Sequence, residues 1–169
     1  DVFEKDDRAA KAVATALEKF PRHAAVYEAA VMHHLTQNKR DAAIAVMEQA
    51  AKQDSTDPRF WLELATTAER VWPLGQIEQR NEHLAKVTPY FDKALAHVTP
   101  ANAEDIRLEV AQHYLLTNEL TRSRELCEKL VKEHNSLQAR KVLFRMYEAS
   151  GEGEKSLAML EAITKQAPE

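Results

Sequence analysis

Apolar residues recur at helical spacing in two runs between Ala24 and Pro58, and a polar break at Asn38 separates the runs. The first run holds Val26, Tyr27, Ala30, Val31 and His34, and the second holds Ala43, Ile44, Met47 and Ala50. Residues three and four apart share one face of a helix, so each run predicts an amphipathic helix. The stretch therefore predicts a pair of antiparallel helices joined by a short turn.

The same pattern returns along the chain at a nearly constant step. Tyr114 and Tyr147 are 33 residues apart, and so are Cys127 and Leu160. A pair of short helices cannot bury its apolar faces alone, so units of this kind stack on one another. The repetition predicts an all-α fold, an α-solenoid of antiparallel helix pairs with about nine helices in total.

The pattern divides the chain into one leading helix, residues 4–20, and four units, residues 22–56, 57–100, 102–135 and 136–168. Phe91 is the counterpart of Met47 but follows it by 44 residues, so the second unit contains an insert, placed near 71–82. The second helix of that unit, 76–98, is expected either to kink or to split at Pro89. We interpret residues 1–169 as a single repeat domain. The unpaired leading helix and the first residue, which is not Met, favour a fragment of a longer chain.

Composition supports helix and argues against several classes of function. The 169 residues include only 3 Gly and 6 Pro, which is typical of helical proteins. The formal net charge is −4 and no basic block occurs, so a nucleic-acid partner is not expected. Apolar runs fall far short of the about twenty residues of a membrane span, so membrane insertion is not expected either. These features favour a soluble protein; its compartment stays open, with the cytoplasm slightly favoured.

Known patterns of catalytic or ligand-binding residues are missing from the sequence. There are 7 His but no HExxH motif, and the adjacent His33 and His34 point about 100° apart on a helix. Phosphate-binding glycine loops and a GxSxG motif are also missing. Cys127 stands at a core position and is expected to be a buried, inert thiol. We therefore expect no enzyme activity, no catalytic residues, no cofactor and no metal.

The chain resembles the tetratricopeptide repeat family, whose units are about 34 residues long. The residues that carry the resemblance are the early aromatics Tyr27 and Trp61, the small Ala65 and Ala111 at the eighth position, Tyr114 and Tyr147 at the eleventh, and Pro21, Pro100 and Pro168 near the terminal proline site. Arg107 and Arg140 depart from the pattern at the early aromatic site. The resemblance implies a right-handed superhelix that acts as a non-catalytic scaffold. The half-a-TPR repeats of RNA-processing scaffolds are an alternative, but their Arg and Glu signature is not evident.

In that family the first helices of the units line a concave groove, and this implies a set of groove residues on their exposed sides. These candidates are Glu28, Met32, Leu35, Arg59, Leu62, Glu63, Thr66, Glu69, Asp105, Leu108, Glu109, Gln112, Lys141 and Arg145. Glu28 and Met32 stand where chaperone-binding members carry Lys and Asn, so that activity is not expected. Trp72 is expected either to enter the core or to form a second interface as an exposed anchor.

Two functions follow from this interpretation. The first is a protein–protein interaction scaffold that binds a peptide or helix with apolar anchors and some basic residues in the groove. The alternative is a structural spacer or self-association segment of a larger protein. The partner is then another protein or peptide, further repeats of the same chain, or a second copy that pairs through the uncapped end helices. The last helix presents Leu157, Leu160 and Ile163 without a capping helix after it.

Overall fold

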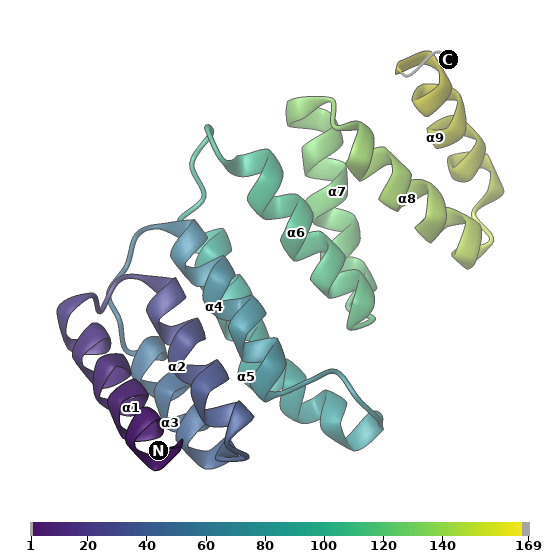
Figure 1. The fold of residues 1–169 in the computed structure, drawn as a ribbon. Coiled ribbons are helices and arrows are strands. Elements are labelled where there is room, and N and C mark those ends of the chain that lie inside the picture. The colour runs from purple at the N-terminus through teal and green to yellow at the C-terminus, as the bar shows by residue number, and fades with distance from the viewer. Residues whose placement is uncertain (1, 167–169) are drawn as a thin grey trace. The chain divides into compact units, whose positions relative to one another are not determined.

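The computed structural model describes residues 2–166, and of residues 2–7, 77 and 78 only the backbone. This part of the chain forms nine α-helices and contains no strand (Figure 1). The helices are α1 (Val2–Lys19), α2 (Ala24–Thr36), α3 (Arg40–Ala51), α4 (Pro58–Val71), α5 (Ile77–Ala96), α6 (Ala103–Leu116), α7 (Leu120–His134), α8 (Leu137–Ser150) and α9 (Gly153–Gln166). The all-α architecture predicted from the apolar spacing is confirmed.

The helices belong to two compact units. The N-terminal unit, residues 1–97, holds α1–α5, and within it α2 packs against α1, α3 and α4 while α4 packs against α5. The C-terminal unit, residues 98–169, holds α6–α9, and each of these helices packs against the next one along the chain. Each unit is thus built from helices that are close neighbours in the sequence.

Three of the turns inside the helix pairs have the same backbone geometry, which gives the repeat a physical basis. Asn38, Asn118 and Gly151 all have positive φ, at 57°, 60° and 73°. Each follows by four residues the eleventh position of its repeat, which is His34, Tyr114 or Tyr147. In each turn the next amide, that of Lys39, Glu119 or Glu152, donates to the carbonyl of that eleventh residue over 2.9, 2.7 and 2.9 Å. Asn and Gly adopt the left-handed conformation most easily, so they end these helices.

Substitution of Gly151 by alanine should therefore destabilise the C-terminal unit by about 1 kcal/mol, because a Cβ is strained at positive φ. A Cβ added at Gly151 or at Gly153 meets no atom within 4 Å, so crowding does not distinguish the two sites. Gly153→Ala is the matched control, because Gly153 begins α9 without positive φ. Urea unfolding followed by circular dichroism measures both variants, and an equal effect of the two would contradict the conformational explanation.

The second repeat, residues 57–100, does not have this turn. Its helix α4 ends at Trp72, which has φ −122°. The chain then needs residues 73–76 before α5 begins at Ile77. Helix α5 runs without a break through Pro89, so the alternative of two separate helices is wrong. Arg40, at the start of α3 in the neighbouring helix pair, stabilises this turn. Its Nε and Nη2 donate to the carbonyl of Val71 over 3.2 and 3.1 Å.

Each unit has its own core. In the C-terminal unit Ala111, Cys127, Leu130, Ala139, Leu143 and Tyr147 form one buried cluster. Tyr114 and Tyr147 are both buried, and the cations eight residues after them, Arg122 and Lys155, lie over their rings at 4.0 and 5.4 Å, as expected for equivalent positions in successive pairs. Phe20 differs from the expectation that the leading helix extends over residues 4–20. It lies beyond the end of α1 and is 52% exposed.

Candidate functional site

The predicted groove residues lie on the first helices of the pairs, as the sequence pattern requires. Those of the N-terminal unit are on α2 and α4, which pack against each other, and those of the C-terminal unit are on α6 and α8. Nine are exposed: Glu28, Arg59, Glu63, Thr66, Asp105, Glu109, Gln112, Lys141 and Arg145. Four are half-buried: Met32, Leu35, Glu69 and Leu108. The set is therefore mainly a polar surface with few apolar side chains in reach of a partner.

Two of these residues are not placed as expected. Leu62 is only 4% exposed, because α4 contacts α2, α3 and α5 and is covered on most sides. Leu108 packs against the core cluster of the C-terminal unit and so has part of its side chain withdrawn from any groove. Both leucines have polar neighbours in the sequence, and this pattern did not predict that their side chains would be covered by other helices.

Trp72 is 4% exposed, so its interpretation as an exposed anchor is wrong. His83 Nδ1 of α5 donates to the carbonyl of Trp72 at the end of α4 over 2.6 Å. This contact fixes the backbone at Trp72, whose side chain is buried within the unit. Trp72 can therefore contact a partner only where a pocket reaches it.

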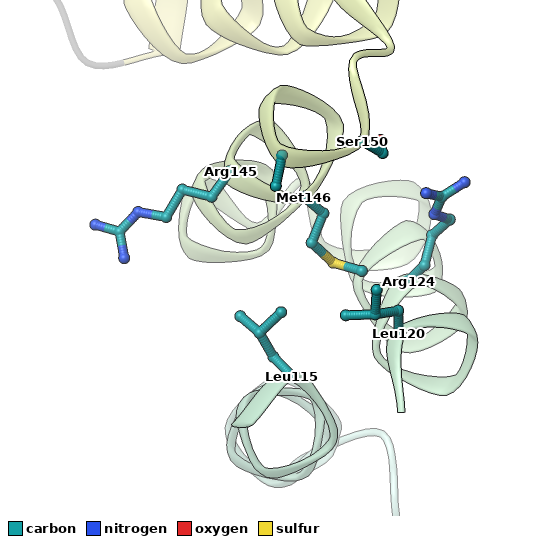
Figure 2. A pocket seen from close by; sticks show the side chains of 7 residues that line it. Leu115, Leu120, Arg124, Arg145, Met146 and Ser150 are labelled. Carbon is teal, nitrogen blue, oxygen red and sulfur yellow. The ribbon is translucent and has the colours of Figure 1, made fainter. Parts of the chain in front are cut away.

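An apolar pocket of about 190 Å³ lies within the C-terminal unit, next to the predicted groove residue Arg145. Its walls come from α6, α7 and α8, with Leu115, Leu120, Arg124, Arg145, Met146, Ala149 and Ser150 as lining residues. Figure 2 shows Leu115, Leu120 and Met146 pointing toward one another from the three helices. An apolar cavity of about 150 Å³ can hold a benzene ring, so this pocket has room for one large apolar side chain.

The apolar surface continues outside the pocket. Leu120 is 45% exposed, and Leu116, the neighbour of Leu115, is 74% exposed. Large exposed apolar side chains that lie close together are uncommon on a monomer surface and often mark an interaction site. Leu120, which also lines the pocket, therefore connects it to the exposed surface of this unit.

The two arginines of the pocket have different surroundings. Arg124 Nη2 donates to Glu152 Oε1 over 2.8 Å, and Lys155 Nζ lies 2.5 Å from Oε2 of the same carboxylate. Lys155, then Ser150 and Arg124, lower the pKa of Glu152 to about 2, so this network stays charged at neutral pH. Arg145 is exposed and makes no hydrogen bond or ion pair with another described residue. Its guanidinium extends away from the centre of the pocket in Figure 2, while its stem forms part of the wall.

The sequence indicated only part of this pocket. Arg145 was among the predicted groove residues, but Leu120, Arg124, Met146, Ala149 and Ser150 were not. One available signal was Leu120, which occupies the position of Arg40 in the first full unit and of Gly153 in the last. Since the site is polar or Gly in these two units, the common core does not require an apolar residue there. The rest of the pocket depends on how three helices meet.

Cys127 is buried, as predicted from its place in the repeat. Burial, with a smaller contribution from the Glu128 carboxylate, raises the pKa of its thiol to about 11. The thiolate form is the nucleophile and is scarce at neutral pH when the pKa is this high. Cys127 thus serves the core and contributes no reactive group to the site.

Comparisons with known proteins agree with the repeat architecture. A family model described as tetratricopeptide repeat matches residues 7–58 and 29–70. A solved structure titled "Crystal structure of MamA" matches with a TM-score of 0.59 and 14% sequence identity, over 97% of this chain and 90% of that chain. No curated protein sequence matches. The predicted resemblance and fold class are confirmed by these matches.

None of the described helices combines the length and apolar character needed to cross a membrane.

Proposed function

From the premise that this chain is a tetratricopeptide-like repeat protein, and thus a protein-interaction scaffold, we propose that its C-terminal unit binds a peptide or helix in the groove beside Arg145. Proteins of this family are generally non-catalytic scaffolds, so the function to be specified is the identity of a partner. The observation that carries the proposal is the apolar pocket between α6, α7 and α8, with Arg145, which pairs with no other described residue, at its edge.

The pocket defines the first feature of the partner. Its volume of about 190 Å³ and its lining by Leu115, Leu120 and Met146 suit one Leu, Ile, Met or Phe side chain. Full burial of such a side chain contributes about 1.5–3 kcal/mol, enough to anchor a short peptide with a few further contacts. Leu120, which is 45% exposed, extends the contact area beside the pocket.

Charge defines the second feature. Arg145 and Lys141 are one helical turn apart on α8, both exposed, and neither makes an ion pair with another described residue. A carboxylate of the partner, close in sequence to the apolar anchor, would pair with them. The acidic groove residues Glu63, Glu69, Asp105 and Glu109 predict, in addition, basic residues in the partner. That prediction is separate from the one made for Arg145 and Lys141.

A library of ten-residue peptides displayed on phage tests this proposal with the full chain as bait. We expect enrichment of sequences with one large apolar residue near an Asp or Glu. Leu120→Asp should weaken the best peptide at least tenfold, because a carboxylate would enter the apolar wall. Arg145→Glu should weaken it about three- to tenfold, as expected for loss of an exposed ion pair plus repulsion. Fluorescence anisotropy with a labelled peptide measures both effects.

Two matched variants separate the pocket from general surface effects. Leu74→Asp is the control for Leu120→Asp, because Leu74 is 42% exposed and lies on the insert of the other unit. Lys132→Glu is the control for Arg145→Glu, because Lys132 is exposed on α7 and does not line the pocket. Unchanged peptide affinity in Leu120→Asp and Arg145→Glu would contradict the proposed groove.

Self-association is the second candidate function, and one observation favours it. On α9, Leu157 and Leu160 are 58% and 43% exposed. The residue equivalent to Leu160 in the preceding pair, Cys127, is buried in the core cluster that includes Leu143 and Tyr147 of α8. Sedimentation velocity up to millimolar concentration tests this function. Dimerisation that Leu160→Asp removes would support it, and a strict monomer would exclude it.

A further inference from the structure

A second pocket, unrelated to the groove of the C-terminal unit, lies within the N-terminal unit between α3 and α5. It has a volume of about 200 Å³ and is lined by Glu48, Ala51, Trp72, Ala85, Lys86, Pro89, Tyr90 and Lys93. Trp72 and Tyr90 are buried and form its interior, whereas Glu48, Ala85, Lys86 and Pro89 are exposed at its mouth. The pocket is thus aromatic inside and opens to the surface.

Its walls are held in place by contacts that occupy several of its polar groups. Tyr90 Oη donates to the carbonyl of Met47 over 2.9 Å, and Lys93 Nζ donates to the carbonyl of Ala51 over 2.7 Å. The ammonium of Lys93 also lies 4.0 Å from the centre of the Trp61 ring. Burial, with the nearby Glu48 carboxylate, raises the pKa of Tyr90 to about 12, so its hydroxyl stays protonated as a donor. These contacts connect α5 to the last turn of α3 and make the pocket a fixed part of the unit.

One backbone acceptor at the wall has lost its usual donor. Pro89 lies inside α5 and has no amide hydrogen, so the helical hydrogen bond to the carbonyl of Ala85 cannot form. Helical carbonyls point toward the carboxyl end of the helix, and both Ala85 and Pro89 line the pocket. The carbonyl oxygen of Ala85, a residue that lines the pocket, therefore keeps an acceptor position that no helical amide uses.

Charged side chains of opposite sign stand at the mouth. Glu48 and Lys86 come from different helices, and neither makes a hydrogen bond or ion pair with another described residue. A ligand with a basic group on one side and an acidic group on the other would satisfy both. Lys93, in contrast, is already engaged with Ala51 and Trp61.

We propose that this pocket binds a tryptophan side chain of a partner peptide, with a basic neighbour facing Glu48 and an acidic neighbour facing Lys86. The volume exceeds the about 150 Å³ that holds a benzene ring, so a two-ring system has room. The indole nitrogen is a donor only, which matches the acceptor left by Pro89. Aromatic side chains in apolar pockets with one polar contact are frequent anchors of protein–protein interfaces. The inference is independent of the groove at Arg145, which belongs to the other unit.

The test uses N-acetyltryptophanamide as a probe with the ¹⁵N-labelled full chain in heteronuclear NMR. We expect saturable shifts of amide signals from residues 48–51 and 85–93 and of the Trp72 indole signal. N-acetylphenylalaninamide has no ring donor and should bind about three- to tenfold more weakly, the effect of one hydrogen bond. Equal binding of the two probes would overturn the assignment of tryptophan, and absence of saturable shifts would overturn the site.

Variants localise the site. Ala85→Leu should abolish the shifts, because the larger side chain fills the mouth of the pocket. Ala96→Leu is the matched control, with the same change at an exposed position near the end of the same helix, outside the pocket. Circular dichroism confirms that both variants fold. Binding that survives in Ala85→Leu would overturn the proposal.

Peptides test the charges at the mouth. Lys-Trp-Glu or Glu-Trp-Lys, with blocked ends, should bind a few-fold more tightly than Ala-Trp-Ala. Glu48→Gln and Lys86→Gln should each reduce this advantage, and the reduction should diminish at high salt. An advantage that both variants retain would overturn the roles of Glu48 and Lys86.

Discussion

Replacement of Trp61 by alanine should destabilise the N-terminal unit by about 3–5 kcal/mol, the usual cost of removing a large aromatic side chain from a core. Trp61 is 2% exposed and its ring lies 5.0 Å from that of Phe60 and 6.5 Å from that of Tyr90. Its indole Nε1 also donates to the carbonyl of Ser55 over 2.8 Å, in the loop before α4. Alanine would leave a cavity and an unpaired carbonyl, and Lys93 would lose the ring it covers.

Tryptophan fluorescence measures this effect in one unit alone. The chain has two tryptophans, Trp61 and Trp72, and both lie in the N-terminal unit. In Trp61→Ala the remaining Trp72 therefore reports urea unfolding of that unit. Trp61→Phe should lose less than alanine, because it retains a ring but not the donor. Glu63→Ala is the control on the same helix, exposed, with an expected change within about 0.5 kcal/mol. A loss below about 1 kcal/mol for Trp61→Ala would contradict this account of the core.

Replacement of Leu130 by alanine should destabilise the C-terminal unit by about 2–5 kcal/mol. Leu130 is fully buried and belongs to the cluster of α7 and α8 that includes Cys127, Leu143 and Tyr147. This cluster is the contact between one helix pair and the next. Because a single pair cannot cover its apolar face, a cavity here weakens the packing that both pairs need.

Hydrogen exchange read by mass spectrometry shows where this loss occurs. We expect faster exchange of α6–α9 in Leu130→Ala, with the exchange of α2–α5 less affected. Leu116→Ala is the matched control, because Leu116 is 74% exposed and its truncation removes little packing. Similar losses in the two variants would show that the cluster does not hold the unit together.

The helices and the turns between them could be predicted from the sequence because both depend on local chemistry. Apolar residues at helical spacing determine which face of each helix is buried, and Tyr114 and Tyr147 are buried as predicted. Asn38 was recognised as a break, and it adopts the left-handed conformation together with Asn118 and Gly151. A residue that ends a helix acts on its own neighbours in the chain, so no distant contact is needed to predict it.

Departures from the family pattern could not be interpreted without the structure. Arg140 stands at the early aromatic site, where Tyr27 and Trp61 donate to carbonyls six residues before them. Its Nη1 also donates to a carbonyl in the loop before its helix, that of Asn135, over 3.3 Å. An arginine thus makes the same kind of contact as the two aromatics. Sequence comparison by residue type cannot reveal this, because the shared property is a donor at the right distance.

The sequence by itself determined that this protein consists of stacked helix pairs, and it identified the core positions and the residue types on the exposed side of each first helix. Only the tertiary structure decided which of those residues can meet a partner. It buried Leu62 and Trp72 and brought Leu115, Leu120 and Met146 around one pocket. The physical reason is that helical spacing defines the face of a side chain on its own helix. Whether that face stays open depends on neighbours that belong to other parts of the chain.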